Sequence, residues 1–170
     1  MRNPPPTMMA VKTFRFRRYA MDRVYIGIDP GLSGAMGVIS PNGAYAIPFD
    51  EDEYVTTLNS CIDEKYAIRA VVEHVGAMPK QGVASTFKFG TNFGWIQGVL
   101  FALGIPYELV RPQKWKKEFS CTSDKNTSIS VARRLFPFVS LLATPRCKKP
   151  HDGMAEALLM AEYAKRKDKI

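Results

Sequence analysis

Short apolar runs separated by turn signals open the patterned part of the chain. Residues 24–29, 35–40 and 44–49 are rich in β-branched, aromatic or other apolar residues, and each run predicts a strand. Asn42-Gly43, between the second and third runs, is a strong hairpin signal. We therefore expect these three strands to form an antiparallel meander.

Helical and strand patterns alternate along the rest of the chain. The predicted elements are helices over 50–64 and 91–103, strands over 68–75 and 107–110, a helical turn over 112–119, and helices over 124–136 and 152–165. The Gly- and Phe-rich segment 78–90 and the basic segment 138–150 predict loops. This order indicates an α/β fold with a mixed five-stranded sheet, three antiparallel strands followed by parallel ones, flanked by helices.

The first 23 residues differ from the rest. They are rich in Pro and Arg, have no clear periodicity, and predict a basic, flexible extension before one domain over 24–170. The extension suits a DNA-binding arm, an organelle-targeting segment or an extra stretch before an internal start site. No apolar run approaches the roughly 18 residues that a membrane span needs, so we expect no membrane partner.

Composition narrows the class of protein. The chain has 170 residues, 46% hydrophobic and 24% charged, which is typical of one globular domain. Cys61, Cys121 and Cys147 lie far apart without a CxxC pair, so neither a zinc site nor a disulfide framework is indicated. Free thiols favour a reducing compartment, and we expect a cytoplasmic protein close to DNA, or an organellar one if the extension is a targeting segment.

Positive charge is concentrated in one part of the chain. The net charge is +8, and residues 111–149 carry ten Lys or Arg against Glu118 and Asp124. Such an excess suits a polyanion such as nucleic acid. The alternative is a solvated basic surface that serves solubility alone.

Four acidic residues are candidates for a catalytic metal site. Asp29 ends the first strand before Pro-Gly, and Glu73 lies in an apolar strand, where an unpaired carboxylate is costly to bury. Asp152 and Glu156 are four residues apart, on one face of the last helix. Each also has a simpler interpretation: a turn residue, a solvent-facing strand residue, or compensation of the helix dipole.

Taken together, the four carboxylates favour hard divalent cations. Mg²⁺ prefers oxygen ligands, and two ions roughly 3.5–4 Å apart would stabilise the attacking and leaving oxygens of a phosphodiester. We expect two Mg²⁺ ions per site, with Mn²⁺ as a substitute. His151 is a candidate for orienting the attacking water, although a lone His is more often a surface or structural residue.

Three segments resemble the RuvC family of Holliday-junction resolvases. They are residues 26–31 (IGIDPG) with 33–35 (SGA), residues 71–73 (VVE) and residues 151–159 (HDGMAEALL). The resemblance covers about residues 24–165 and is nearer to the phage-type and plastid resolvases than to the standard bacterial enzyme. In one respect the chain departs from the family: its last two acidic positions are four residues apart, whereas bacterial members often have three.

The resemblance implies an RNase H-like fold and a homodimer that binds four-way DNA junctions. The dimer would nick two opposed strands symmetrically by two-metal hydrolysis, with Asp29, Glu73, Asp152 and Glu156 as ligands. His151 and Asp152 compete for the third position because of the altered spacing, and we choose Asp152 because an oxygen ligand suits Mg²⁺ better than imidazole.

Basic and aromatic residues around these acids are candidates for DNA contact. Lysines and arginines would hold phosphates, and the phenylalanines of the predicted loop would stack on bases at an opened junction. These candidates are Lys80, Phe87, Lys88, Phe89, Lys114, Lys116, Lys117, Arg133, Arg134, Lys148 and Lys149. The alternatives are solvated lysines, a Trp115 that closes the core, and phenylalanines packed under the loop. Gly90, Gly94 and Gly98 permit close helix approach, either in a dimer or onto the sheet.

Two rival functions remain, and a third is excluded by chain length. One is an RNase H-like nuclease that acts on another substrate, such as an RNA–DNA hybrid. Another is a junction-binding protein without catalysis, which would bind DNA independently of Mg²⁺. The third, a nucleotide-binding fold of the actin or sugar-kinase type, needs two lobes, and this chain is too short for both.

Overall fold

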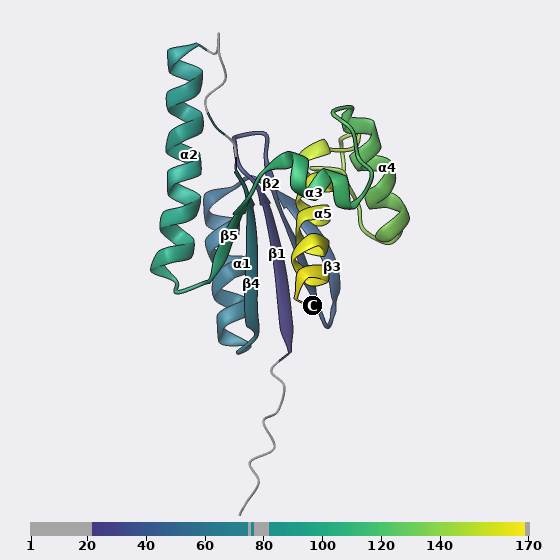
Figure 1. The fold of residues 1–170 in the computed structure, drawn as a ribbon. Helices are drawn as coiled ribbons and strands as arrows, with labels where there is room; N and C mark the ends of the chain where they lie inside the picture. Colours follow the sequence, from purple (N-terminus) through teal and green to yellow (C-terminus); the bar gives the residue numbers. More distant parts are fainter. Residues whose placement is uncertain (1–21, 75, 77–81, 169–170) are drawn as a thin grey trace, which may run out of the picture.

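The computed structural model describes residues 22–74, 76 and 82–168 (Figure 1). Nearly all of the predicted extension lies outside these residues, as does Lys80. Within the described residues, no helix is both long enough and apolar enough to cross a membrane. Cys61, Cys121 and Cys147 are all free thiols.

A five-stranded mixed sheet forms the centre of the fold, in the order β3-β2-β1-β4-β5. Its strands are β1 (Arg23–Asp29), β2 (Ala35–Ser40), β3 (Gly43–Pro48), β4 (Ala67–Glu73) and β5 (Tyr107–Val110). The first three strands pair antiparallel, whereas β4 pairs parallel to both β1 and β5. The predicted meander, the hairpin and the mixed sheet are therefore confirmed.

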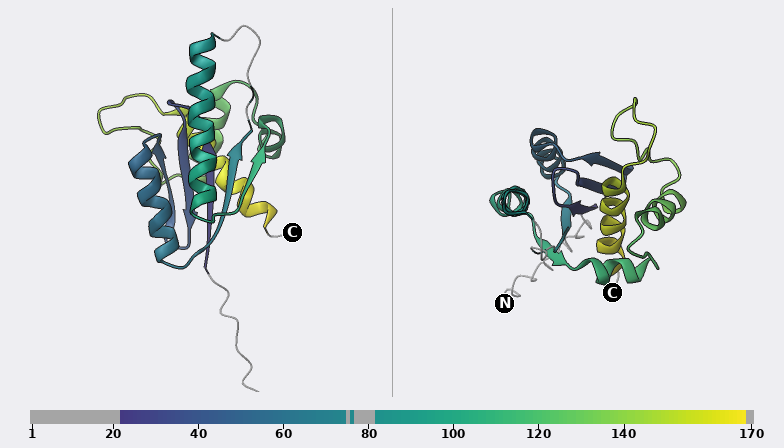
Figure 2. Two further views of the ribbon diagram at one scale, coloured as in Figure 1. Left: turned by 90° about the vertical axis from the view of Figure 1, so that its left-hand side faces the viewer. Right: turned by 90° about the horizontal axis from the view of Figure 1, so that it is seen from above.

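Helices cover both faces of the sheet, as the two views of Figure 2 show. Helices α1 (Glu51–Asp63) and α2 (Val83–Ala102) lie on one face, and α5 (Asp152–Lys167) lies on the other. Helices α3 (Pro112–Glu118) and α4 (Lys125–Leu135) pack outside α5. Because α5 is enclosed between the sheet and these two helices, its residues from Gly153 to Ala161 are all buried, which explains its apolar sequence.

Two glycines let α5 approach the sheet closely. Gly27 of β1 and Gly37 of β2 are register partners. A Cβ added at Gly27 would lie 2.2 Å from the carbonyl oxygen of Ala157, and one at Gly37 would lie 2.5 Å from the amide nitrogen of Leu158. Any side chain at these positions would push α5 away, so the two glycines fix how near the helix comes to the strands.

The sheet separates two apolar cores. Val24, Ile26 and Ile28 of β1 pack towards α1 and α2, whereas Val71 of β4 packs towards α5 with Trp115 of α3. This alternation follows from the two-residue period of a strand. It also puts every second residue of β1 and β4 on the α5 face, where the acids at the ends of these strands lie.

One predicted loop is wrong. The segment 78–90 was expected to be irregular, but α2 begins at Val83, so Phe87, Lys88 and Phe89 are helical. The segment was taken as a loop because it is rich in Gly and Phe, yet an exposed helical glycine such as Gly90 costs only about 1 kcal/mol relative to alanine. The rings of Phe89 and Phe93, one turn apart, stack at 6.3 Å across this position and favour a continuous helix.

Candidate functional site

Two acidic residues meet at the carboxyl edge of the sheet. Asp29 and Glu73 are the last residues of β1 and β4, which run parallel with Ile28 opposite Val72. The two carboxylates are therefore neighbours on the same face. Glu73 ends its strand rather than lying inside it as the sequence suggested, and it is only 7% exposed. Acids at adjacent ends of parallel strands are well placed for a ligand.

The first turns of α5 bring two more acids to this edge. Asp152 is its first residue and Glu156, 7% exposed, follows one turn later. A Cβ added at Gly153 would lie 3.1 Å from Oδ2 of Asp29, so the missing side chain allows α5 to begin against that carboxylate. His151 is the N-cap: its Nδ1 accepts a hydrogen bond from the amide of Met154 at 3.2 Å. His151 thus has a structural role as a helix cap, and its role in orienting a water stays a prediction.

The buried carboxylates of Glu73 and Glu156 have specific hydrogen-bond donors. Oε1 of Glu73 accepts from the indole Nε1 of Trp115 at 2.9 Å. Oε1 of Glu156 accepts from Nζ of Lys116 at 2.7 Å and from the hydroxyl of Ser128 at 3.1 Å. Burial without partners would be expensive for either carboxylate. Helices α3 and α4 therefore supply hydrogen-bond donors to Glu73 of the sheet and to Glu156 of α5.

A second lysine pairs with the exposed acid of the site. Nζ of Lys125, the first residue of α4, forms a salt bridge with Oδ2 of Asp152. This pair is more open than the first, since the side chain of Lys125 is 68% exposed and that of Lys116 is 19% exposed. The two lysines approach α5 from different helices, α3 and α4, so Glu156 and Asp152 each have their own ammonium group.

Electrostatic coupling links the four acids. Burial raises the pKa of Asp29 well above its usual range, and the charges of Glu73, Glu156 and Asp152 raise it further, against the opposing charge of Lys125. Burial also raises the pKa of Glu73, although its indole donor opposes this. Burial acts to raise the pKa of Asp152, but the hydrogen bond and charge of Lys125 outweigh it and lower the pKa. The site carries a surplus of negative charge.

The donor set is chemically suited to a hard cation, although its side chains do not enclose one. Among the described residues, no three Asp, Glu, His or Cys side chains converge closely enough to hold a metal ion. The four acids offer only carboxylate oxygens, the ligands that Mg²⁺ and Mn²⁺ prefer. Ammonium groups already lie against two of them, at Glu156 and Asp152. The residue types therefore suit divalent ions, which would have to displace the two lysines.

The turn after Asp29 is held from the other face of the sheet. The amide of Gly31, whose φ is +124°, donates to Oδ1 of the buried Asn92 at 2.6 Å. Asn92 belongs to α2, so this bond ties the turn to that helix. The bond fixes the backbone two residues beyond the Asp29 carboxylate.

The predicted DNA contacts fall into two groups. Most of the basic residues are exposed on the α3–α4 side and in the loop before α5: Lys114, Lys117, Arg133, Arg134, Lys148 and Lys149. Lys116 instead points into the acidic site, and Lys114 pairs with Glu108 at 3.3 Å. Trp115 is fully buried, so the alternative that it closes the core is confirmed.

The other group lies on α2, whose first half extends past the carboxyl edge of the sheet (Figures 1 and 2). Phe87 is 75% exposed there, and Lys88 and Phe89 line a hollow of about 430 Å³ beside the turn that follows Asp29. The remaining lining residues are Pro30, Gly31, Leu32, Ser33 and Ser85. The aromatic and basic residues of α2 thus flank the acidic site, from a helix rather than a loop.

Sequence reasoning missed three partners of the acids. Lys125 and Ser128 lie one turn apart on α4 and contact Asp152 and Glu156. The sequence signal was the position of Ser128, a polar residue on the apolar side of a predicted helix. In the structure its side chain is fully buried. The bond from Trp115 to Glu73 had no signal, because it joins residues 42 positions apart.

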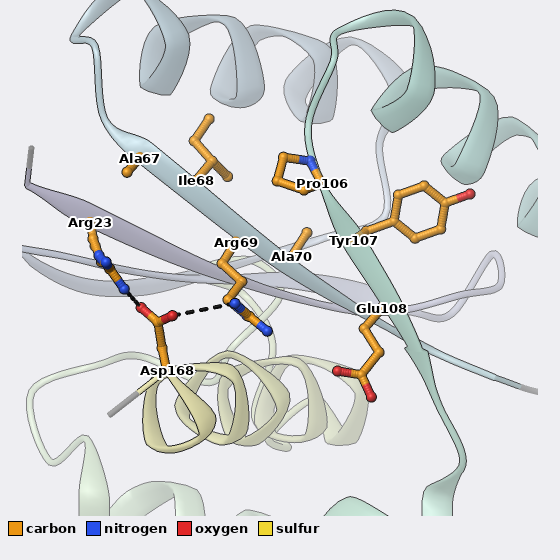
Figure 3. Close-up of a pocket in the computed structure, with 9 residues that line it drawn as sticks. All are labelled: Arg23, Ala67, Ile68, Arg69, Ala70, Pro106, Tyr107, Glu108 and Asp168. Carbon is orange, nitrogen blue, oxygen red and sulfur yellow. Dashed lines mark hydrogen bonds and ion pairs between the residues drawn. The ribbon is translucent and has the colours of Figure 1, made fainter. Parts of the chain in front are cut away.

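The opposite edge of the sheet has a pocket of about 340 Å³ (Figure 3). Asp168, just after α5, pairs there with Arg23 and Arg69, and it accepts a hydrogen bond from Tyr25 at 2.9 Å. The hydrogen bond with Arg23 is the main cause that lowers the pKa of Asp168. Glu108 also lines the pocket, so two arginines face two acids, and the pocket lacks the negative surplus found at the carboxyl edge.

Comparison with known proteins identifies the fold. No protein-family profile and no curated protein sequence matches the chain. A structure of Thermus thermophilus RuvC matches with a TM-score of 0.53 and 22% identity, over 85% of this chain and 96% of that chain. A structure of T. thermophilus RuvC in complex with Holliday junction substrate matches with a TM-score of 0.53, 16% identity and the same coverage. The chain therefore has the RuvC-like, RNase H-like fold that its sequence predicts.

Proposed function

We propose that the chain is a metal-dependent endonuclease that resolves four-way DNA junctions. The observation that carries the proposal is the meeting of Asp29, Glu73, Asp152 and Glu156, from two strands and one helix, at the carboxyl edge of a RuvC-like sheet. A solved structure with this fold is a complex with Holliday junction substrate, which supports junction DNA as the substrate class.

The four carboxylates are the proposed ligands for two Mg²⁺ or Mn²⁺ ions. When bound, such ions would activate a water and neutralise charge on the phosphodiester that is cut. The residues of the chain would orient the carboxylate ligands and the water. Trp115 orients the Glu73 carboxylate through its indole hydrogen bond, and Ser128 orients that of Glu156. His151 keeps Nε2 for the attacking water, since Nδ1 caps α5.

The proposed DNA path crosses both flanks of the acidic site. On one flank, the exposed Arg133, Arg134, Lys148 and Lys149 suit phosphate contacts. On the other, the hollow lined by Lys88 and Phe89 suits a phosphate and an unstacked base. Because α2 projects beyond the sheet, its residues would contact a DNA strand that extends away from the acidic site.

A homodimer through α2 is the proposed assembly. Added Cβ atoms at Gly90, Gly94 and Gly98 would meet nothing within 4 Å, so these glycines do not serve packing onto the sheet. On α2, Val83 and Phe101 are 87% and 82% exposed, and a partner helix would cover this apolar surface. Sedimentation should show a dimer that Phe101→Glu dissociates, whereas a wild-type monomer at high concentration would contradict the proposal.

The test is cleavage of a labelled four-way junction by the full chain. With Mg²⁺ we expect paired nicks at symmetric positions on opposed strands, and with a chelator we expect none. Asp29→Asn should bind the junction without cutting it. Preferential cutting of an RNA–DNA hybrid would assign another RNase H-like nuclease activity. Tight junction binding with no scission under any metal condition would assign a non-catalytic binding protein.

A further inference from the structure

Two lysines occupy the positions where the acidic site needs positive charge. Nζ of Lys116 lies 2.7 Å from Oε1 of Glu156, and Nζ of Lys125 is bonded to Oδ2 of Asp152. Both pairs join residues that are far apart in sequence, so they depend on the packing of α3 and α4 against α5. They do not result from a local helix pattern.

The two ion pairs differ in how easily they open. Lys116 is held on several sides: its ammonium lies 5.2 Å from the centre of the Trp115 ring, and Glu156 accepts a second hydrogen bond from the buried Ser128. Lys125 is largely exposed, so water readily replaces its contact with Asp152. A buried pair is costly to break, whereas an exposed pair contributes little.

We propose that Lys116 and Lys125 are internal counter-ions, which hold the carboxylates of the site until divalent cations displace them. The inference rests on the proposed metal-dependent function and deepens it. Lys125 leaves Asp152 at little cost, whereas Lys116 must leave a buried carboxylate. One of the two cation positions therefore fills more readily than the other.

Displacement also prepares the site for DNA. Each lysine has a flexible four-carbon stem, so a released ammonium stays within reach of the acidic edge. There the released ammonium group can contact the phosphates of a bound DNA strand. Its positive charge is then no longer neutralised by a carboxylate. Metal loading and phosphate binding thus reinforce each other through the same two side chains.

The test is a titration of the full chain with Mn²⁺ in the absence of DNA. The electron paramagnetic resonance signal of free Mn²⁺ measures how much of the ion is bound. Lys116→Met should tighten Mn²⁺ binding by on the order of 10-fold, because no ammonium then competes for Glu156. Lys125→Met should tighten binding by about 2- to 3-fold, in keeping with its exposure. Lys117→Met, on the same helix as Lys116 but exposed, should change the affinity less than about 2-fold.

Charge rather than packing must explain the effect. Lys116→Arg keeps the positive charge and should bind Mn²⁺ no more tightly than the wild type. If Lys116→Met does not fold, as judged by circular dichroism, Lys125→Met and Lys116→Arg decide the question. Folded methionine variants that bind Mn²⁺ no better than the wild type overturn the inference.

The same titration separates this inference from the proposed function. If the wild type binds Mn²⁺ and the methionine variants bind it equally well, the counter-ion role alone fails. If the wild type and every folded variant leave all Mn²⁺ free, the acidic site holds no metal and the proposed metal-dependent cleavage fails with it.

Discussion

The two edges of the sheet use the same residue type for opposite purposes. At the carboxyl edge, Asp29 faces three further carboxylates, and both burial and their charges raise its pKa. At the amino edge, roughly 20 Å away along β1, Asp168 is paired with Arg23 and Arg69, and its pKa is lowered. The surroundings therefore destabilise the ionised form of Asp29 and stabilise the ionised form of Asp168.

This difference separates a candidate site from a structural ion-pair cluster. The arginines around Asp168 lower its pKa, so its ionised form is stabilised by folding. Buried carboxylates with raised pKa values, such as Asp29, are concentrated at functional sites. The pocket at the amino edge is therefore a weaker candidate, even though it is a well-formed hollow (Figure 3).

Loss of a carboxylate at the carboxyl edge should have the largest effect. Glu73→Gln and Glu156→Gln should each lower the junction cleavage rate by about 1000-fold or more, since the proposed ions lose a charged ligand. Asp168→Asn, at the other edge, should stay within about 2-fold of the wild type. Single-turnover cleavage with Mg²⁺ measures all three, and full activity in either Gln variant removes that residue from the site.

Trp115→Phe tests how the site is supported. The substitution keeps a ring in the core but removes the donor to Glu73, so the free energy of unfolding should fall by about 1–3 kcal/mol. Trp95→Phe, on the opposite face of the sheet, is the matched control and should cost less. Urea unfolding measures both, and an equal cost for the two would mean that the indole bond contributes nothing beyond packing.

The exposed Arg133 and Arg134 of α4 should contact DNA phosphates, whereas Arg69 at the amino edge of the sheet should not. Arg133→Gln combined with Arg134→Gln should weaken junction binding and lower the slope of log affinity against log salt by about 1 to 2. Arg69→Gln, which removes a partner of Asp168, should leave the slope unchanged. Fluorescence anisotropy at several salt concentrations measures the slope, and equal slopes throughout would exclude Arg133 and Arg134 as contacts.

Stability should respond with opposite signs at the two edges. Asp168 has a lowered pKa in the fold, so its carboxylate stabilises above the unfolded pKa, and that stabilisation is lost as the pH falls through the folded pKa. Asp29 has a raised pKa, so its ionisation destabilises the fold at neutral pH. At pH 7 with chelator, Asp29→Asn should raise the Tm by a few degrees and Asp168→Asn should lower it.

The pH dependence provides the check. Both differences should shrink as the pH falls, because Asp29 and then Asp168 become protonated in the wild type and resemble asparagine. Differential scanning calorimetry from pH 7 downwards follows each change. A fall in Tm for Asp29→Asn at pH 7 would show that its carboxylate is satisfied, and the contrast between the edges would disappear.

Local patterns were enough to predict the sheet and the positions of the acids. The alternation of apolar runs and turns predicted all five strands within one or two residues, and Asp29 at the end of β1 was expected. The last helix was predicted from its apolar face with Asp152 and Glu156 one turn apart. The loop predicted over 78–90 was wrong from Val83 onwards, because a Gly- and Phe-rich composition was taken as a loop signal, whereas an exposed glycine is tolerated within a helix.

The order of the elements, the alternation of faces and the end positions of Asp29 and Asp152 follow from the sequence alone, since these depend on periods of two and 3.6 residues. Glu73 was expected inside its strand, but the strand ends at this residue. The partners of the four acids depend instead on how the helices pack in three dimensions: Trp115 for Glu73, Lys116 and Ser128 for Glu156, and Lys125 for Asp152. The physical reason is that charge and hydrogen bonding act over a few ångströms in space, and contacts between residues tens of positions apart leave no period in the chain.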